Sequence, residues 1–279
     1  MTMGGEIGRS LVAAAPWTEQ ALLIGVASAR FAFAFLMLPL FSSSVIPPLV
    51  RNSVIVAFGL VALSLPIRFD PSTLSAGQWL WLYAREAAAG VTIGFFFGSF
   101  LWAMASAGEI IDNKTGATIA QVVDPLSGVS QPLSGLLFGR FAQVVFVTAG
   151  GLTLLVGTIM LSFAIWPMAP AGLALDLSSV TVFEGEFGRF FLLAFVIASP
   201  ALLILYIIDL GMGLLNRFAQ NFNVFTLSLP IKAAAGTFVI ILILPALAQL
   251  ITGDIGSRAE VTGRVLERTA TPREAEARP

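Results

Sequence analysis

The 279-residue sequence contains no cysteine and no histidine, and these two absences exclude most enzymatic sites. Without histidine, the chain cannot build a Ser-His-Asp triad or an HExxH zinc helix. Without cysteine, it has no thiol nucleophile, no thiolate ligand and no disulfide. We therefore expect a protein that is not an enzyme, with no catalytic residues, no metal site and no cofactor.

Charged residues are scarce as well. They make up 11% of the sequence, while hydrophobic residues make up 57%, and a soluble globular domain carries roughly a quarter charged residues. The composition therefore predicts an integral membrane protein. The net charge of -1 also argues against nucleic acid as a partner, because binding to its phosphates needs clustered lysine and arginine.

Six apolar runs have roughly the length of a membrane-spanning helix, about 20 residues. They cover residues 20–41, 53–67, 79–107, 136–166, 190–215 and 231–251. The second run is short for a full crossing, and the fourth contains Gly150 with Gly151, and Gly157, where we expect breaks. The sequence thus predicts an all-α integral membrane protein with about six long, partly broken hydrophobic helices arranged as hairpins.

A long polar interruption, residues 108–132, separates the third run from the fourth. Loops longer than about 12 to 15 residues without structure of their own are usually functional or disordered. This segment has apolar side chains to bury, among them Ile119 and Val122, and Pro125 disfavours a helix at Asp124. We expect an ordered re-entrant loop between the third and fourth helices.

Three polar residues, Glu109, Asp112 and Lys114, flank this loop. Glu109 and Asp112 lie one helical turn apart on one face. Ionisable residues at membrane depth are functional candidates by default, so a proton relay is one interpretation. Solvated helix termini are the other, because these residues, like Arg85 and Glu86, lie at the ends of apolar runs.

Small residues form a stripe in the third run. Gly90, Gly94 and Gly98 recur every four residues and therefore share one helical face. Such a stripe lets another backbone approach closely. We expect helix packing here rather than a ligand site.

Several later segments read as solvent-exposed or as contacts. Residues 167–189 are acidic and predict an aqueous connection. Pro230 is expected to turn the chain sharply, and Lys232 at the following helix start opposes the helix dipole, which indicates a partner or a lipid head group. From Asp254 onward the chain is highly charged and lacks aromatics, which predicts a solvated tail with one short helix at 261–266.

Three segments resemble a known family. IPPLVR at 46–51, AGEIIDNKTGATIAQVVDPLSG at 107–128 and NVFTLSLPIK at 223–232 are similar, in this order, to the marked segments of the FliR/SctT family. These are export-gate proteins of flagella and of type III secretion injectisomes. The resemblance covers about residues 17–251, and its central segment is the specific one. In the other two segments we expect subunit or lipid contacts at Pro47, Arg51, Asn223, Pro230 and Lys232.

A second similarity divides the chain. Residues 219–247 resemble part of the two-helix Q/S subunit of the same apparatus, and the R/T subunit is regarded as a fusion of a P/R-like and a Q/S-like part. The resemblance therefore implies four parts. These are an N-terminal segment (1–18), a P/R-like helical part with the loop (19–189), a Q/S-like hairpin (190–252) and a charged C-terminal tail (253–279).

The resemblance also implies surroundings. P/R-like and Q/S-like subunits would form a helical complex with this chain, raised out of the bilayer plane. Further implied partners are a cytoplasmic switch protein of the FlhB/SctU type, needle or rod subunits, and exported protein substrates. The implied location is the bacterial inner membrane, as a multi-pass protein within the secretion system basal body. The positive-inside rule gives no single topology for six independent spans, which agrees with helices held by other subunits.

The resemblance implies that the loop 116–132 is a plug that closes the export channel before secretion. Its small and uncharged side chains suit a segment that shifts without leaving a buried charge unpaired. The residues expected in the plug are Gly116, Ala117, Thr118, Ile119, Gln121, Val122, Val123, Asp124 and Pro125. The alternative is a loop that only docks subunits.

Other functions stay open beside this one. The motifs favour an injectisome subunit over a flagellar export gate subunit, which would share much of the same pattern. An ion-coupled secondary transporter or channel would use Glu109, Asp112 and Asp209 as ion sites. An intramembrane aspartyl protease is excluded, because Asp209 lacks a second aspartate in a Gly-x-Gly-Asp setting.

Overall fold

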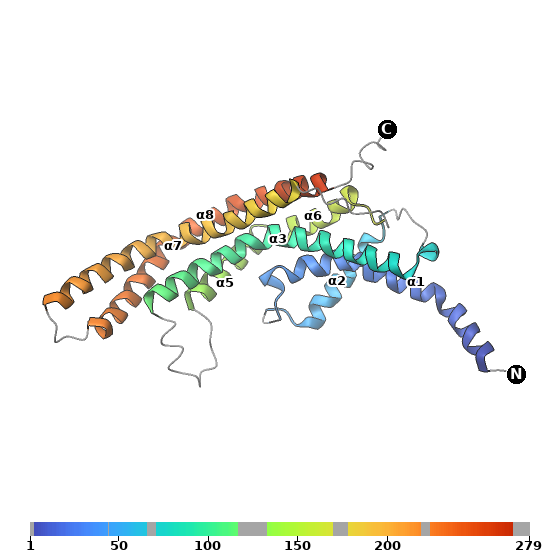
Figure 1. Cartoon of the computed structure of the whole chain (residues 1–279), viewed down its shortest axis with the longest axis horizontal. Coiled ribbons are helices and arrows are strands. Elements are labelled where there is room, and N and C mark those ends of the chain that lie inside the picture. The colour runs from blue at the N-terminus through green and yellow to red at the C-terminus, as the bar shows by residue number, and fades with distance from the viewer. Residues whose placement is uncertain are drawn as a thin grey trace. The chain divides into compact units, whose positions relative to one another are not determined.

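The computed structural model describes residues 3–43, 45–65, 71–116, 133–169, 178–218 and 224–269. These residues form helices joined by turns, and no strand occurs among them (Figure 1). The expected all-α class is thereby confirmed. The helices group into two compact units. The first unit comprises Met1–Phe97, Thr153–Val180 and Ala259–Pro279, and the second comprises Gly98–Leu152 and Thr181–Arg258.

Four of the described helices are long and apolar enough to cross a membrane. They are the segment Trp17–Leu36 of α1 (Met3–Leu36), α3 (Ala76–Thr115), α7 (Ser178–Phe218) and α8 (Val224–Thr269). At about 1.5 Å per residue, each of the last three exceeds the bilayer core of about 30 Å. Helix α2 (Pro48–Ala62) is apolar but shorter, as expected for the second run.

The fifth membrane candidate is a bent pair of helices. Two residues separate helix α5 (Leu133–Thr148) from α6 (Gly151–Ile165), and the pair is bent by 69°. Gly150 has a φ of 82°, a left-handed conformation that side chains with a Cβ rarely adopt. A Cβ at Gly151 would lie 2.5 Å from the ring of Phe146. The break expected at these two glycines is confirmed, whereas the break expected at Gly157 was wrong, because Gly157 lies inside α6.

In the first unit, α1 and α2 form an antiparallel hairpin with an aromatic core. Phe31 of α1 stacks on Phe58 of α2 with 5.3 Å between ring centroids. Phe35 stacks at 3.9 Å on Phe41 of the short 3-10 helix η1 (Pro39–Phe41). A second short 3-10 helix, η2 (Pro71–Thr73), precedes α3. These ring contacts pack α2 and the turn that contains η1 against α1.

Helix α3 approaches α1 closely at two glycines of the first unit. A Cβ at Gly90 would collide with the backbone carbonyl oxygen of Arg30, and a Cβ at Gly94 would lie 2.6 Å from that of Ala34. Only glycine leaves room for the neighbouring backbone at these positions. The third residue of the stripe, Gly98, is buried at the start of the second unit.

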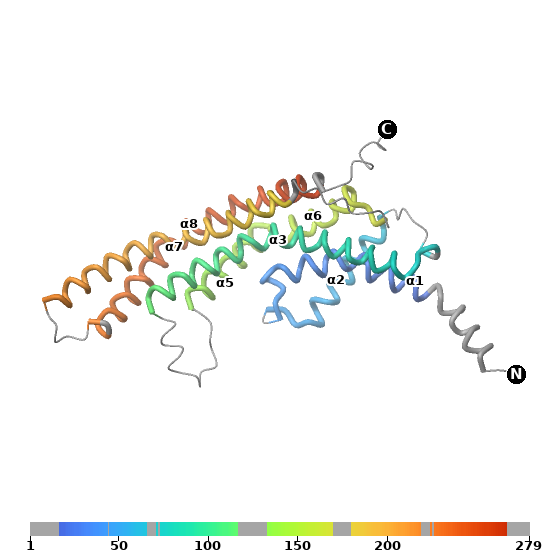
Figure 2. The backbone as a smooth tube through the Cα atoms, viewed as in Figure 1, coloured from blue at the N-terminus to red at the C-terminus, as the bar shows by residue number. Residues whose placement is uncertain are grey.

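The second unit contains two further hairpins. Helices α7 and α8 lie side by side and run antiparallel, as the backbone trace shows (Figure 2). Helices α3 and α5 also run antiparallel. The ring centroids of Phe100 and Phe146 are 6.3 Å apart, and a Cβ built at Gly139 would lie 3.4 Å from the Cβ of Ala105. The predicted arrangement as hairpins is confirmed.

Two expectations about where helices end or turn differ from the structure, one beside the polar loop and one at Pro230. Helix α3 continues to Thr115, so the expectation that residues 108–115 belong to a loop was wrong. The reason is that Ile111 is buried and that no proline lies between Gly108 and Asp124 to stop the helix. Pro230 does not turn the chain sharply, because it lies inside α8. Membrane helices tolerate such prolines when the freed carbonyl finds another partner.

Two charged segments are helical rather than aqueous. Helix α7 begins at Ser178, so the expected aqueous connection at 167–189 was wrong for its second half, and Glu186 is buried. The expected solvated tail was wrong as far as Thr269, because α8 extends that far with Asp254 and Arg258 buried. The physical reason is the same in both cases: opposite charges on neighbouring helices neutralise each other.

Candidate functional site

The last turns of α3 carry Glu109, Asp112 and Lys114, and they lie where α5 begins. Gly108 packs against the backbone of Ser134, and a Cβ at Gly108 would lie 2.5 Å from the amide nitrogen of Gly135. We call these last turns of α3, with the start of α5, the loop base. The loop base brings the two ends of the polar loop together within the second unit.

Asp112 ties the two helices at the loop base. Its carboxylate is only 3% exposed. Its Oδ2 accepts hydrogen bonds from the backbone N–H groups of Ser134, at 2.7 Å, and Gly135, at 3.2 Å. These groups belong to the first turn of α5 and have no partner within that helix. Asp112 therefore acts as an N-cap from a different helix, and its charge also complements the α5 dipole.

Lys114 ties α3 to the α7–α8 hairpin. Its Nζ lies 2.6 Å from Oδ2 of Asp209 on α7, and Lys232 of α8 pairs with Oδ1 of the same carboxylate. The Lys114 ammonium also lies 4.0 Å from the ring centroid of Tyr206, a cation-π distance. We call Lys114, Asp209 and Lys232 the lysine–aspartate triad. It fixes the loop base to both helices of the hairpin.

Helix α3 ends in a way that suits the start of a loop. Gly116 has a φ of 84°, the left-handed conformation that commonly follows the last residue of a helix. Beside it, Thr115 is buried, with its methyl carbon 3.1 Å from a Cβ built at Gly236 of α8. The other expected plug residues lie outside the described residues, and these are Ala117, Thr118, Ile119, Gln121, Val122, Val123, Asp124 and Pro125.

The three acids of the transporter alternative do not share one site. Glu109 is exposed, Asp112 binds the α5 amides, and Asp209 binds two lysines. No group of three His, Cys, Asp or Glu residues that could hold a metal occurs in the part of the chain that the structure describes. The arrangement favours mechanical coupling of helices over ion binding by the acids.

The remaining expected contact residues have ordinary local roles in the fold. Pro47 precedes α2 as its N-cap residue, and Arg51 donates a hydrogen bond of 3.1 Å to the carbonyl oxygen of Phe41. Pro230 lies within α8, and Asn223 lies outside the described residues. Their contacts with a partner or with lipid stay predictions.

Sequence reasoning missed a buried ion pair in the first unit. Arg30 and Glu86 are both 0% exposed, with Nε 2.8 Å from Oε2 and Nη2 3.0 Å from Oε1. Arg30 also donates to Ser162 Oγ at 2.7 Å and to the carbonyl oxygen of Trp166 at 2.9 Å, and lies 3.8 Å from the ring centroid of Phe163. The available signal was that Arg30 is the only charge in the run 20–41.

A second cluster of charges joins three helices of the second unit. Glu186 of α7 accepts hydrogen bonds from Ser99 of α3, at 2.6 Å, and from Arg258 of α8, at 2.5 Å. Asp254 accepts from Arg258, at 3.1 Å, and from Arg189. Two acids and two bases thus balance inside the unit. Sequence reasoning had placed the acids in solvent.

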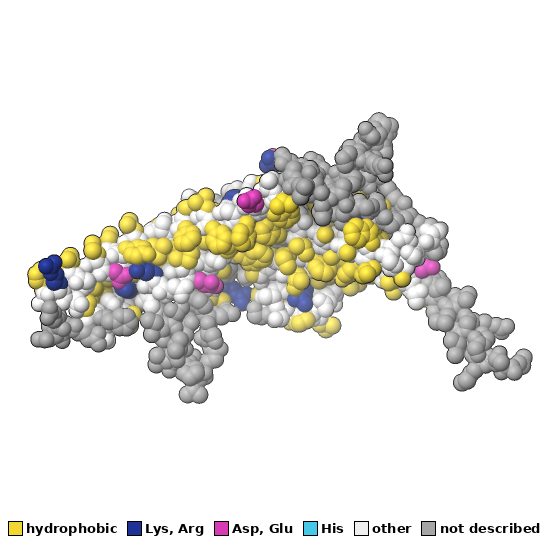
Figure 3. Space-filling model, viewed as in Figure 1, with side chains coloured by type: hydrophobic (Ala, Val, Ile, Leu, Met, Phe, Trp, Pro, Cys, Tyr) yellow, Lys and Arg dark blue, Asp and Glu magenta, His cyan; other side chains and the backbone are white. Residues whose placement is uncertain are grey.

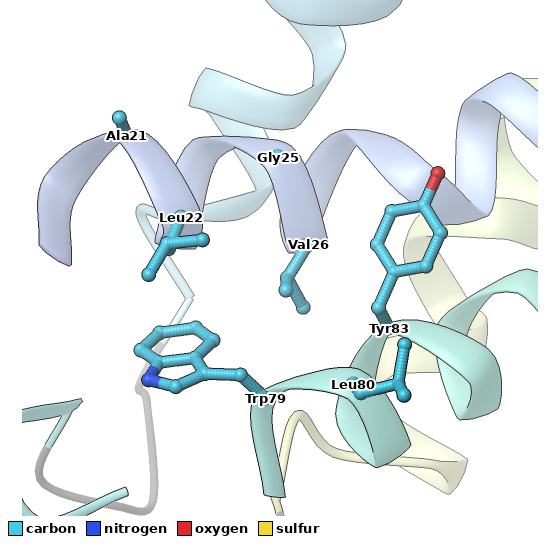
Figure 4. Close-up of a pocket in the computed structure, with 7 residues that line it drawn as sticks. All are labelled: Ala21, Leu22, Gly25, Val26, Trp79, Leu80 and Tyr83. Atoms are coloured by element: carbon cyan, nitrogen blue, oxygen red, sulfur yellow. The ribbon is translucent and has the colours of Figure 1, made fainter. Parts of the chain in front are cut away.

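The first unit also contains an apolar pocket of about 340 Å³ between α1 and α3. In the close-up, Leu22 and Val26 of α1 point toward Trp79 of α3, and Tyr83 closes one side (Figure 4). Its lining residues are Ala21, Leu22, Gly25, Val26, Trp79, Leu80 and Tyr83. None of these residues brings a carboxylate or a base, so the pocket offers no group for chemistry.

The surface agrees with a membrane protein. On the face drawn in Figure 3, apolar side chains form broad patches and charged side chains are few. Long apolar helices, charges paired inside the units and a fixed loop base define a multi-pass membrane protein. The sequence also matches the model of the bacterial export proteins, family 1, over residues 21–257. The chain belongs to this family, and the FliR/SctT resemblance is confirmed as that of a type III export protein of the bacterial inner membrane.

Individual relatives agree with this assignment. The chain is 31% identical over 215 residues to Yop proteins translocation protein T of Yersinia pestis, which covers 76% of this chain and 82% of the relative. It is 31% identical over 223 residues to the surface presentation of antigens protein SpaR of Salmonella typhimurium, covering 78% and 82%. It is 26% identical over 239 residues to the flagellar biosynthetic protein FliR of Bacillus subtilis, covering 85% and 91%.

Proposed function

We propose that the chain is a structural and gating component of the type III secretion export apparatus. It helps to form the channel for unfolded substrates and closes that channel with residues 116–132. It works without catalysis, beside P/R-like and Q/S-like subunits and a switch protein of the FlhB/SctU type, within the basal body. Exported proteins pass through this channel, and needle or rod subunits join it.

The observation that carries this proposal is the clamp at the loop base. Asp112 binds the first amides of α5, and Gly108 packs against the backbone of Ser134. Both ends of the loop are therefore held at one point, and a sequence without cysteine offers no disulfide that could tie the segment between them. A plug needs this combination, because its attachment must stay in place when the segment between the ends is displaced.

The injectisome is the better candidate for the apparatus. Identity is 31% to translocation protein T and to SpaR, against 26% to the flagellar FliR of Bacillus subtilis. The difference is modest, but it agrees with the form of the central motif. In the proposal, the substrates are therefore secreted effector and needle proteins rather than flagellar subunits.

A loop deletion in the native host tests the plug. Removing residues 117–122 keeps Gly116, Asp112 and the clamp, so the subunit should still copurify with its P/R-like and Q/S-like partners. We expect resting cells to leak small ions or dyes through the assembled complex. A Gly-Ser replacement of the same length is the matched control for loop length, and it should leak as well because it lacks the apolar seal.

Two outcomes would overturn the plug. A tight resting membrane with an intact complex would mean that the loop does not seal the channel. Loss of the complex in both variants would mean that the loop docks subunits. The transporter alternative is tested separately with Glu109→Gln and Asp209→Asn, since abolished solute transport with an assembled complex would favour it.

A further inference from the structure

The lysine–aspartate triad contains every lysine of the protein. Lys114 and Lys232 are the only lysines in the sequence, and all other basic residues are arginines. Both lysines pair with the two oxygens of one carboxylate, that of Asp209. Lysine differs from arginine in presenting a compact ammonium with three rotatable donors, which suits a phosphate oxygen. The concentration of both lysines at one point therefore calls for an explanation.

The triad carries an unbalanced positive charge. Two ammonium groups face one carboxylate, which leaves a net charge of +1, and the side chains of Lys114, Asp209 and Lys232 keep 27%, 31% and 14% of their surface exposed. The two charge clusters described above differ, because Arg30 with Glu86 and the four-residue cluster on α7 and α8 are neutral. Each lysine also has donor hydrogens beyond the one that it directs to Asp209.

The surroundings of the triad are apolar and face outward. Tyr206, Ile207 and Leu210 of α7 are 58%, 60% and 69% exposed, and α7 and α8 are candidate membrane spans. An unbalanced charge beside apolar surface is costly in a bilayer unless an anion compensates it. Near a membrane surface, that anion is the phosphate of an acidic lipid, which basic pockets between helices bind.

The position along the helices agrees with a head group. Asp209 lies nine residues before Phe218, the last residue of α7, and Lys232 lies eight residues after Val224, the first residue of α8. The exposed Arg217 lies still nearer the end of α7. Lysine side chains near a helix end extend toward the interface, so their ammonium groups reach the phosphate level.

We propose that Lys114 and Lys232 form a binding site for the phosphate of an anionic phospholipid. Asp209 holds the two ammonium groups side by side, and the ring of Tyr206 orients Lys114. The lipid's acyl chains lie along the exposed apolar residues of α7. The site shares Lys114 with the loop base, but lipid binding does not require that the loop closes the channel.

The purified full chain, labelled with 13C at lysine Cε, gives two lysine signals and reports on the site without any mutation. In neutral detergent, we expect added phosphatidylglycerol to shift both signals at concentrations at least tenfold lower than phosphatidylcholine with the same acyl chains. Equal responses to the two lipids would overturn the proposal. Equal responses to phosphatidylglycerol and inorganic phosphate would reduce the site to a free-anion site and would also overturn it.

Variants distinguish a triad that binds lipid from a triad that only holds the helices together, because the two hypotheses predict different changes in lipid binding. Asp209→Asn removes the competing negative charge but keeps an amide oxygen that can still accept a hydrogen bond from one ammonium group. Phosphatidylglycerol should therefore bind at least several-fold more tightly and raise the melting temperature more than in the parent protein. Lys114→Met with Lys232→Met should lose the lipid preference, while Arg264→Met, which removes a 61% exposed charge elsewhere on α8, should keep it. Unchanged or weaker lipid binding by Asp209→Asn would contradict the proposal. Carbodiimide cross-linking of either lysine to a copurified subunit would assign the site to a protein carboxylate instead.

Discussion

Replacing Glu86 with methionine keeps roughly the length of the side chain but removes the charge that neutralises Arg30. Both groups are 0% exposed, so the guanidinium would stay buried without a counter-charge. Breaking a buried pair by removing one partner costs about 3 to 5 kcal/mol. Arg30→Met should cost about the same, because it strands the carboxylate of Glu86.

The double variant Arg30→Met with Glu86→Met should be more stable than either single variant. It removes both charges of the pair, and Ser162 Oγ keeps its hydrogen bond of 2.6 Å to the carbonyl oxygen of Ile159. The main loss is the partner of the Trp166 carbonyl oxygen, which costs about 1 to 3 kcal/mol. The single changes would sum to about 6 to 10 kcal/mol, so the expected coupling energy is at least about 3 kcal/mol.

The assay is reversible unfolding of the purified protein in mixed micelles, by titration with a denaturing detergent and tryptophan fluorescence. The matched control is the pair Arg264 and Glu260, which are 3.6 Å apart and 61% and 73% exposed. Its coupling energy should not exceed about 0.5 kcal/mol. A double variant of Arg30 and Glu86 that loses the full sum of the single losses would refute the reasoning, because the two charges would then not depend on each other.

The same titration tests three further changes. Gly94→Leu should destabilise by about 2 kcal/mol or more through its clash with Ala34, while Gly77→Leu, in open space on the same helix, should stay within about 1 kcal/mol. Asp112→Ala should cost about 1 to 2 kcal/mol, and Asp112→Asn, which can still cap α5, much less. Arg258→Met should cost about 3 to 5 kcal/mol, whereas Arg189→Met, 37% exposed, should cost about 1 kcal/mol or less. The reverse order within any of these pairs would contradict the corresponding contact.

The apolar segments were predictable from composition because a bilayer demands long, uninterrupted hydrophobic helices. The break at Gly150 and Gly151 was also predictable, since glycine is the residue that takes a left-handed turn at low cost. The motif between residues 107 and 128 identified the family without any knowledge of the fold. These features are local, and the sequence states local preferences directly.

The candidate site was predictable only in part. Asp112 and Lys114 were selected from their position beside the loop, but their partners, the amides of α5 and Asp209, come from other helices. The part played by Glu109 in the site stays a prediction. Arg30 was not selected at all, although a lone charge within an apolar run was the available signal.

The sequence by itself determined the class of the protein, its apolar helices and its family, because each of these follows from composition or from a contiguous motif. The tertiary structure alone decided which charges are buried and with which partners. Glu186, Asp254 and Arg258 read as solvent-exposed in a one-dimensional sequence, because other charged residues lie within a few positions of them in the chain. They are buried because helices distant in sequence place opposite charges within hydrogen-bonding distance, which offsets the cost of removing each charge from water.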